Sequence, residues 1–197
     1  MLVSQLNRTS TLVRRPRPRL VCLDLQREYV VPGRPLYADG AGLVADHCAR
    51  VLTFARRQGW RVIHAQRRHA EGLFDRTSYF GAPIEGLRPL ISEPVFAHTG
   101  LSAFGNADFA AELRDAVGQD VFLIGFSLSS TCLATALAAV DLGLAITVVD
   151  EAVGAAPAPG LAAGDARAAA ITLLSPIVGL VSADELFEQT AVMEVTQ

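Results

Sequence analysis

The chain has 197 residues, of which 51% are apolar, and it carries 17 basic and 20 acidic side chains for a net charge of −3. All 17 basic residues are arginine, which excludes a Schiff-base lysine, a P-loop lysine and a lysine general base. The near-neutral charge argues against a nucleic-acid partner. No uncharged apolar run reaches the ~18 residues that a membrane helix needs, and the length predicts one domain.

The first 18 residues are predicted to be a flexible N-terminal arm, followed by the domain at residues 19–197. Residues 1–23 contain five arginines and no acidic residue. This composition also occurs in transit peptides, so that alternative stays open, whereas the missing apolar segment argues against secretion. The three cysteines show no close pairing, which suits a reducing compartment, and a cytoplasmic protein is expected.

The first half of the chain predicts three strands and one helix. Apolar runs predict strands at 19–25, 60–65 and 94–97, and helical spacing of apolar residues predicts a helix at 36–58. Residues 66–92 are polar and contain glycine and proline, which indicates a long loop of the kind that often covers a site.

The second half continues the alternation of strands and helices. Strands are predicted at 120–125, 144–149 and 177–181, and helices at 106–117, 127–142 and 165–174. Ser182 and Glu185 form a capping box that begins a last helix. The pattern predicts a single three-layer α/β/α domain with a mostly parallel, doubly wound sheet of about six strands. In such folds ligands bind beyond the carboxyl ends of the strands.

Polar residues follow three of these strand ends. Asp24 follows the first strand, with Gln26 and Tyr29 close behind, and a carboxylate at such a point is poorly solvated and suited to proton transfer. His98 follows the third strand and is a candidate acid, base or polar clamp. Each could instead be a structural group, Asp24 by binding loop amides and His98 by an ordinary hydrogen bond.

The fourth strand leads into Gly125-Phe126-Ser127-Leu128-Ser129-Ser130-Thr131-Cys132 at the start of a helix. Unpaired amides at a helix N-terminus attract anions or a developing oxyanion. A thiol placed there is expected to have a lowered pKa. The serines and threonine are also good helix caps, so a purely structural role is equally compatible with the pattern.

Three segments together resemble the isochorismatase-like (cysteine hydrolase) superfamily, which includes isochorismatases, nicotinamidases and N-carbamoylsarcosine amidohydrolases. The segments are LVCLDLQREYV, FAHTGLSAFGNADFAAEL and LIGFSLSSTCLATALAAVDLGLAITVVDEA, and the resemblance runs from about Arg19 to Glu188. It implies that Asp24 is the family aspartate. It also implies a non-proline cis peptide at Ser127–Leu128, which would expose amides to an oxyanion.

The sequence departs from the family pattern at two catalytic positions. The family lysine falls on His98, and a chain without lysine cannot supply it from elsewhere. Counting from Gly125, Thr135 and Gly143 places Thr131 at the nucleophile position, with Cys132 one residue late. One residue on a helix turns a side chain by about 100°, so Cys132 is expected to point partly away from the site.

The resemblance implies a hydrolase that acts on a small molecule, at an amide-type C–N bond or a vinyl-ether C–O bond, with Asp24 as general acid/base. His98 would replace lysine as a cation or hydrogen-bond donor, and Thr131 or Cys132 would lie at the reacting centre. Two alternatives stay open: a catalytically inactive binding protein on the same fold, and a thiol hydrolase that uses Cys132.

Further expectations concern binding and assembly. Gln26, Tyr29, Phe104, Ser127 and Leu128 are candidate substrate-binding residues. No metal is expected, because neither a zinc-ligand spacing nor the nicotinamidase Asp-x-His motif occurs, and no other cofactor is expected. Family habit implies a homo-oligomer, a dimer or larger.

Overall fold

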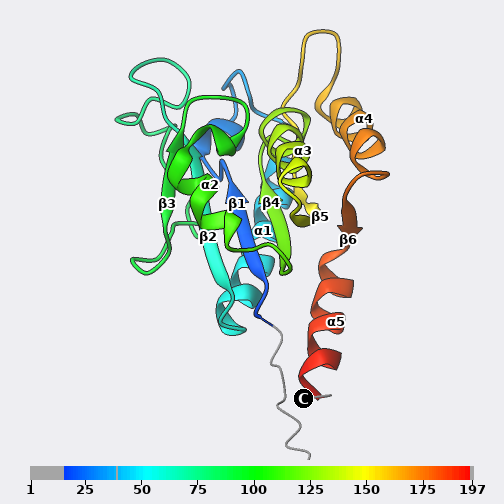
Figure 1. Cartoon of the computed structure of the whole chain (residues 1–197). Coiled ribbons are helices and arrows are strands. Elements are labelled where there is room, and N and C mark those ends of the chain that lie inside the picture. The colour runs from blue at the N-terminus through cyan, green and yellow to red at the C-terminus, as the bar shows by residue number, and fades with distance from the viewer. Residues whose placement is uncertain (1–15, 39, 196–197) are drawn as a thin grey trace, which may run out of the picture.

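Six parallel strands form one sheet in the order β3-β2-β1-β4-β5-β6 (Figure 1). The structure is a computed structural model that describes residues 16–38 and 40–195, so nearly all of the predicted arm lies outside it. The strands are β1 (Arg19–Leu23), β2 (Arg61–Arg67), β3 (Val95–His98), β4 (Asp120–Gly125), β5 (Ala145–Val153) and β6 (Gly179–Val181). The central strands are apolar on both faces because helices cover both, which confirms the predicted three-layer fold.

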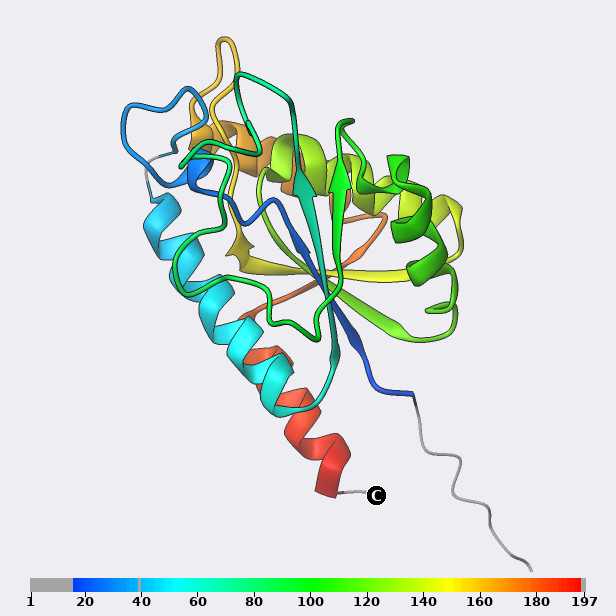
Figure 2. The same ribbon diagram turned by 90° about the vertical axis from the view of Figure 1, so that its left-hand side faces the viewer.

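Helices divide between the two faces of the sheet. α1 (Ala41–Arg57) and α5 (Ala183–Val195) lie side by side on one face, as Figure 2 shows. α2 (Ala107–Arg114), α3 (Leu133–Asp141) and α4 (Ala163–Leu174) cover the other face. Each face buries its own apolar cluster, which includes Leu20 and Leu52 on the α1 face and Val21 and Phe109 on the α2 face. No helix among the described residues is long and apolar enough to cross a membrane.

Several element boundaries differ from the predicted ones. α2 ends at Arg114 instead of residue 117, because the chain then forms tight turns and passes through Gly118 at φ +82° before β4. The helix predicted at 127–142 begins as a π-helical turn, Leu128–Cys132. The capping box is present: the Ser182 hydroxyl accepts from the Glu185 amide, and the Glu185 carboxylate accepts from the Ser182 amide.

The order of the strands places a topological switch point between β1 and β4. From β1 the chain extends the sheet outward through β2 to β3, and then crosses to β4 on the other side. Ligands of doubly wound folds bind at the carboxyl edge near such a point. The loop between β2 and β3 closes over this edge, with the Arg27 amide donating to Ala82 O at 3.0 Å and the Ile84 amide to Leu25 O at 2.9 Å.

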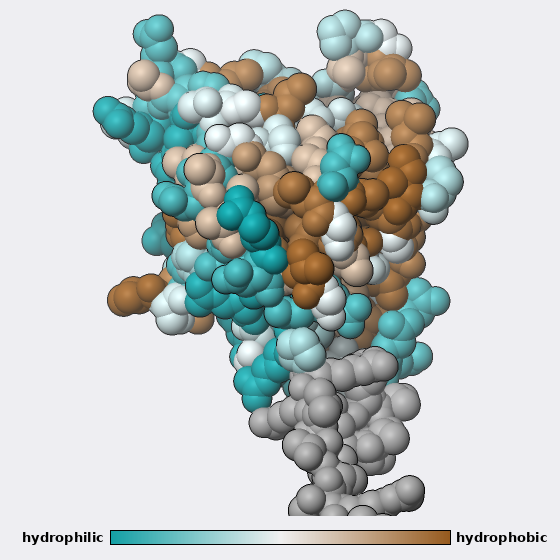
Figure 3. All heavy atoms as spheres, viewed as in Figure 1, coloured by the Kyte–Doolittle hydropathy of each residue, from teal (hydrophilic) through white to brown (hydrophobic). Residues whose placement is uncertain are grey.

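An apolar surface lies over α3, α4 and the segment leading to β6 (Figure 3). Its exposed large side chains are Leu137, Val140, Leu173, Ile177 and Leu180. A surface of this kind is what the predicted homo-oligomer would bury, and that assembly stays a prediction.

Candidate active site at the carboxyl edge of the sheet

Asp24 is the residue around which the candidate site is built. It follows β1 with a left-handed backbone, φ +45°, and is fully buried. Oδ1 accepts from the Arg67 amide at 2.9 Å and faces His98 Nε2 at 2.8 Å. Oδ2 accepts from the Thr131 hydroxyl at 2.9 Å. Parallel strands bring their carboxyl ends to one edge, so residues distant in sequence meet at this carboxylate.

The proton positions on His98 follow from its two neighbours. Nδ1 lies 3.0 Å from Gly100 O, which only accepts, so Nδ1 carries a hydrogen. Nε2 lies 2.8 Å from the Asp24 carboxyl, and that contact requires one proton between the two atoms. The pair is therefore either carboxylate and imidazolium or carboxylic acid and neutral imidazole. In both forms its total charge is zero.

Thr131 and Cys132 are consecutive residues of the π-helical turn, and their side chains point in different directions. The Cys132 amide donates to Ser127 O five residues back at 3.0 Å, and Thr131 is directed to Asp24. Cys132 lies fully buried in the apolar cluster under α3, with neighbours that include Ala136. Burial, and secondarily the charge of Asp24, raises the pKa of the Cys132 thiol well above its usual value. The lowered thiol pKa expected from the sequence is therefore wrong.

Cys132 is expected to be unreactive in the folded protein. Iodoacetamide at neutral pH should leave Cys132 unlabelled by mass spectrometry, and labelling should appear once the chain is unfolded in urea, because only a thiolate with access to solvent reacts. Cys48, equally buried, is the internal control. Selective alkylation of Cys132 in the native protein would contradict this and would favour the thiol hydrolase.

Arg67 was missed by the sequence analysis and lies at the centre of the site. It is the last residue of β2, and its guanidinium donates to Thr131 Oγ1. Its Nε lies 3.6 Å from Asp24 Oδ2, is buried and has no hydrogen-bond partner. The guanidinium carbon is 5.2 Å from the centroid of the Phe74 ring. The sequence offered one signal for Arg67: it is a polar residue at the end of a strand. Polar residues at three other strand ends were identified as candidates for that reason.

The five candidate substrate-binding residues all make contacts within the protein. Gln26 clamps the end of β2, with Oε1 accepting from the Arg67 amide at 3.0 Å and Nε2 donating to Arg67 O at 3.0 Å. Tyr29 is buried and stacks on Phe126 with ring centroids 5.0 Å apart. Phe104 packs edge-on against Phe109 at 5.1 Å.

Ser127 and Leu128 lie at the turn after β4. Ser127 Oγ accepts from the Ala156 amide at 2.8 Å, and the Leu128 amide donates to Gly154 O at 2.7 Å. The cis peptide is Phe126–Ser127, one residue earlier than the resemblance implied. The amides at this helix start were expected to face an oxyanion; of these, the Leu128 amide donates to Gly154 O, and the Ser130 and Cys132 amides donate to Ser127 O.

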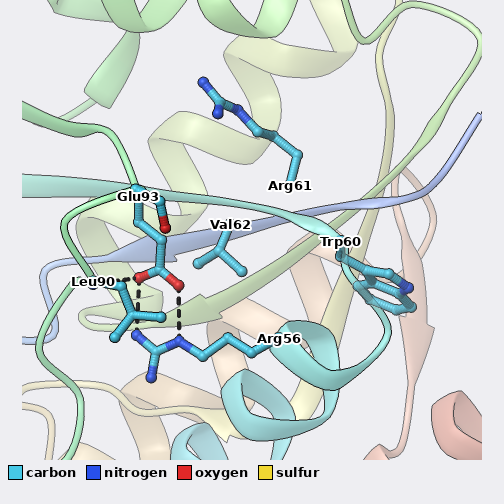
Figure 4. Close-up of a pocket in the computed structure, with 7 residues that line it drawn as sticks. Arg56, Trp60, Arg61, Val62, Leu90 and Glu93 are labelled. Carbon is cyan, nitrogen blue, oxygen red and sulfur yellow. Dashed lines mark hydrogen bonds and ion pairs between the residues drawn. The ribbon is translucent and has the colours of Figure 1, made fainter.

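The site is closed to solvent. Asp24 and Thr131 have no exposed surface and His98 is 4% exposed. A hollow of about 180 Å³ lies elsewhere, at the amino-terminal part of β2, where Arg56, Val62 and Glu93 form part of its wall (Figure 4). At the candidate site itself, the Arg67 side chain lies beside Asp24, with Nε 3.6 Å from Oδ2. Among the described residues, no group of three or more His, Cys, Asp or Glu is placed to hold a metal ion.

Comparison with known proteins identifies the family. The isochorismatase domain model matches residues 18–183. A maleamate amidohydrolase from Pseudomonas putida is 32% identical over 155 residues, which are 70% of this chain and 72% of that protein.

Two solved structures share the fold over most of their length. An isochorismatase from Pseudomonas putida has 25% identity and a TM-score of 0.75, covering 85% of this chain and 89% of its own. An isochorismatase family protein from Desulfovibrio vulgaris has 26% identity and a TM-score of 0.76, covering 88% of this chain and 98% of its own. The chain belongs to the isochorismatase family of hydrolases.

Proposed function

We propose that this protein hydrolyses the C–N bond of a small-molecule amide, with Thr131 as nucleophile and Asp24 as general acid/base. The observation that carries the proposal is the 2.9 Å hydrogen bond from the Thr131 hydroxyl to Asp24 Oδ2. A hydroxyl is a weak nucleophile until a base within hydrogen-bond reach removes its proton. The similarity to an amidohydrolase supports a C–N bond over a vinyl ether.

The reaction balances with these two groups and one water. Asp24 takes the Thr131 proton as Oγ1 bonds to the amide carbon, and the carbonyl electrons move to oxygen. The carbonyl re-forms, the C–N bond breaks, and Asp24 protonates the leaving nitrogen. Water then attacks the Thr131 ester and gives its proton to Asp24, which returns a proton to Oγ1 as the ester bond breaks.

His98 is a positioning residue for Asp24. Its Nε2 holds Oδ1 at 2.8 Å, and Gly100 O fixes the ring through Nδ1. As imidazolium it would stabilise the carboxylate form that the first step needs, which is the role that the family lysine position would otherwise fill.

Replacing Asp24 tests the proposal. The purified chain would be assayed for ammonia release from a panel of small primary amides, and Asp24→Asn should lower kcat/KM on the order of 10³-fold because the base is lost. Thr131→Ala should abolish turnover and Thr131→Ser should restore part of it. Asp150→Asn is the control, since Asp150 pairs with Arg167 away from this site. Unchanged turnover in Asp24→Asn would refute the assignment.

A second candidate function, a catalytically inactive binding protein, is favoured by the closed site. Arg67 occupies the space beside Asp24 and Thr131, and both are without exposed surface. Ligand binding by the purified chain, together with no turnover of any amide in the panel, would support this alternative. Turnover that requires Asp24 would exclude it.

A further inference from the structure

The cluster of Asp24, His98 and Arg67, in which the Arg67 side chain is 14% exposed, carries one uncompensated positive charge. The Asp24–His98 pair is neutral wherever its shared proton resides, and Arg67 adds a full charge. The Glu28 carboxylate, which accepts from the Phe74 amide, makes two 2.8 Å hydrogen bonds to Arg34. Its negative charge therefore balances the charge of Arg34. Arg68, the next residue, bonds to the neutral Gln66. An unbalanced charge that is largely removed from water is costly, so this site is suited to an anion.

Arg67 differs in its partner from three other arginines of the described chain. Arg34, Arg56 and Arg61 each hold a carboxylate through two nitrogens. The Arg67 guanidinium donates to a neutral threonine hydroxyl, its Nε has no acceptor, and the Asp24 oxygen at 3.6 Å is beyond hydrogen-bond distance. A planar guanidinium matches a carboxylate with two parallel bonds, and that partner is missing here.

We propose that Arg67 is the residue that selects the substrate, and that it does so by binding a carboxylate on a short-chain amide. The inference rests on the proposed function and specifies its substrate class: an amide that bears a carboxylate a few bonds from the scissile carbon. Arg67 Nε lies only 3.6 Å from the Asp24 oxygen that faces the nucleophile, so anchor and scissile bond must be close together.

The same contact explains the closed site. In this structure the Arg67 guanidinium donates to Thr131 Oγ1 and so engages a lone pair that the nucleophile needs. A substrate carboxylate that binds the guanidinium provides a better acceptor, and Arg67 then leaves the Thr131 oxygen free. Its backbone stays fixed, because the Arg67 amide and carbonyl remain bonded to Asp24 and Gln26.

Binding of succinate, which contains no amide to hydrolyse, tests the anchor separately from catalysis. Isothermal titration calorimetry should show that Arg67→Gln binds succinate on the order of 10- to 100-fold more weakly than the wild type, as expected for loss of charged hydrogen bonds. Arg68→Gln removes the same charge from the neighbouring position and should bind like the wild type. The neutral 1,4-butanediol, which has no bond to hydrolyse, should bind wild type and Arg67→Gln alike.

A chemical probe covers the case in which Arg67→Gln fails to fold. Phenylglyoxal modification of Arg67 in the wild type, followed by mass spectrometry, should be slowed by succinate and unaffected by 1,4-butanediol. Arg67→Lys, which keeps the charge and loses the planar fork, should bind succinate with intermediate affinity.

Each outcome bears on one hypothesis. Equal succinate affinity in the wild type and Arg67→Gln, or no binding to the wild type, would overturn the anchor. Inorganic phosphate competing as well as succinate would also overturn it, since the site would then take any small anion. Succinate binding that depends on Arg67, in a protein that turns over no amide, would leave the anchor standing and reject the proposed hydrolysis.

Discussion

Gly125→Ala is expected to prevent stable folding. The backbone of Gly125 has φ +124°, and a Cβ there would lie 1.9 Å from Leu23 O in the neighbouring strand β1. Backbone atoms of paired central strands cannot yield as a flexible side chain would. The expected loss exceeds about 4 kcal/mol, the range of severe core and backbone defects. Urea unfolding followed by circular dichroism, or the soluble yield if no folded protein is recovered, measures it.

Gly118→Ala is the matched control for this substitution. Gly118 also has a left-handed backbone, φ +82°, but a Cβ there would meet nothing within 4 Å. Only the conformational cost remains, about 1 kcal/mol. Equal stability of the two variants would contradict the close contact between the Gly125 backbone and Leu23 O in β1.

Glu93→Ala is expected to remove much of the protein's sensitivity to acid. Burial by itself raises the pKa of Glu93, but hydrogen bonds from Arg56, from the Leu90 amide and from His64 outweigh it and lower the pKa from 4.5 to about 2. Figure 4 shows this carboxylate between Arg56 and Leu90 at the wall of the hollow. The side chain is 7% exposed, so solvent screens the pairing little.

The direction of the pH effect follows from the lowered pKa. A carboxyl that holds its proton less tightly when folded stabilises the fold above pH 4.5, and this contribution is lost as the pH falls through about 2. The shift corresponds to about 3 kcal/mol of unfolding free energy. Burial lowers the pKa of His64 in the same cluster, so its protonation below its ordinary pKa further favours unfolding.

The measurement is the unfolding free energy from urea titrations between pH 7 and pH 2. The wild type should lose stability steeply below pH 4.5, and Glu93→Ala should be less stable at pH 7 with a flatter profile. Glu112→Gln is the control: Glu112 pairs with two arginines, Arg19 and Arg61, but is more exposed than Glu93, so its effect should stay within about 1 kcal/mol. An unchanged acid profile in Glu93→Ala would contradict the assignment.

Prediction from the sequence was most successful for the strands and the fold. Apolar runs such as 120–125 and the alternation of strands with helices require burial on both faces, and that requirement depends on local residue patterns. The boundaries of helices were less well predicted. α2 stops at Arg114 because turns and Gly118 redirect the chain. A π-helical turn precedes α3, and the residue pattern does not distinguish such a turn from an α-helical one.

The candidate site was predicted in part, and the reason lies in what each residue depends on. Asp24, His98 and Thr131 come from strand ends and motif spacing, which are written in the sequence, and the structure brings their side chains together. Arg67 was passed over although it ends β2, because the predicted strand stopped at residue 65 and Arg67 was counted with the loop that follows.

The sequence by itself determined the fold class, the edge of the sheet that would hold the polar residues, and the absence of lysine chemistry. Only the tertiary structure decided which polar residues meet. The turn of the chain after β4 directs Thr131 to Asp24 and buries Cys132. The pairing of β1 with β2 places the Arg67 amide and guanidinium beside the same carboxylate. The hydrogen bonds from Arg67 and Thr131 to Asp24 join residues that are 43 and 107 positions apart in the sequence. Such contacts depend on strand order and register, which no local pattern encodes.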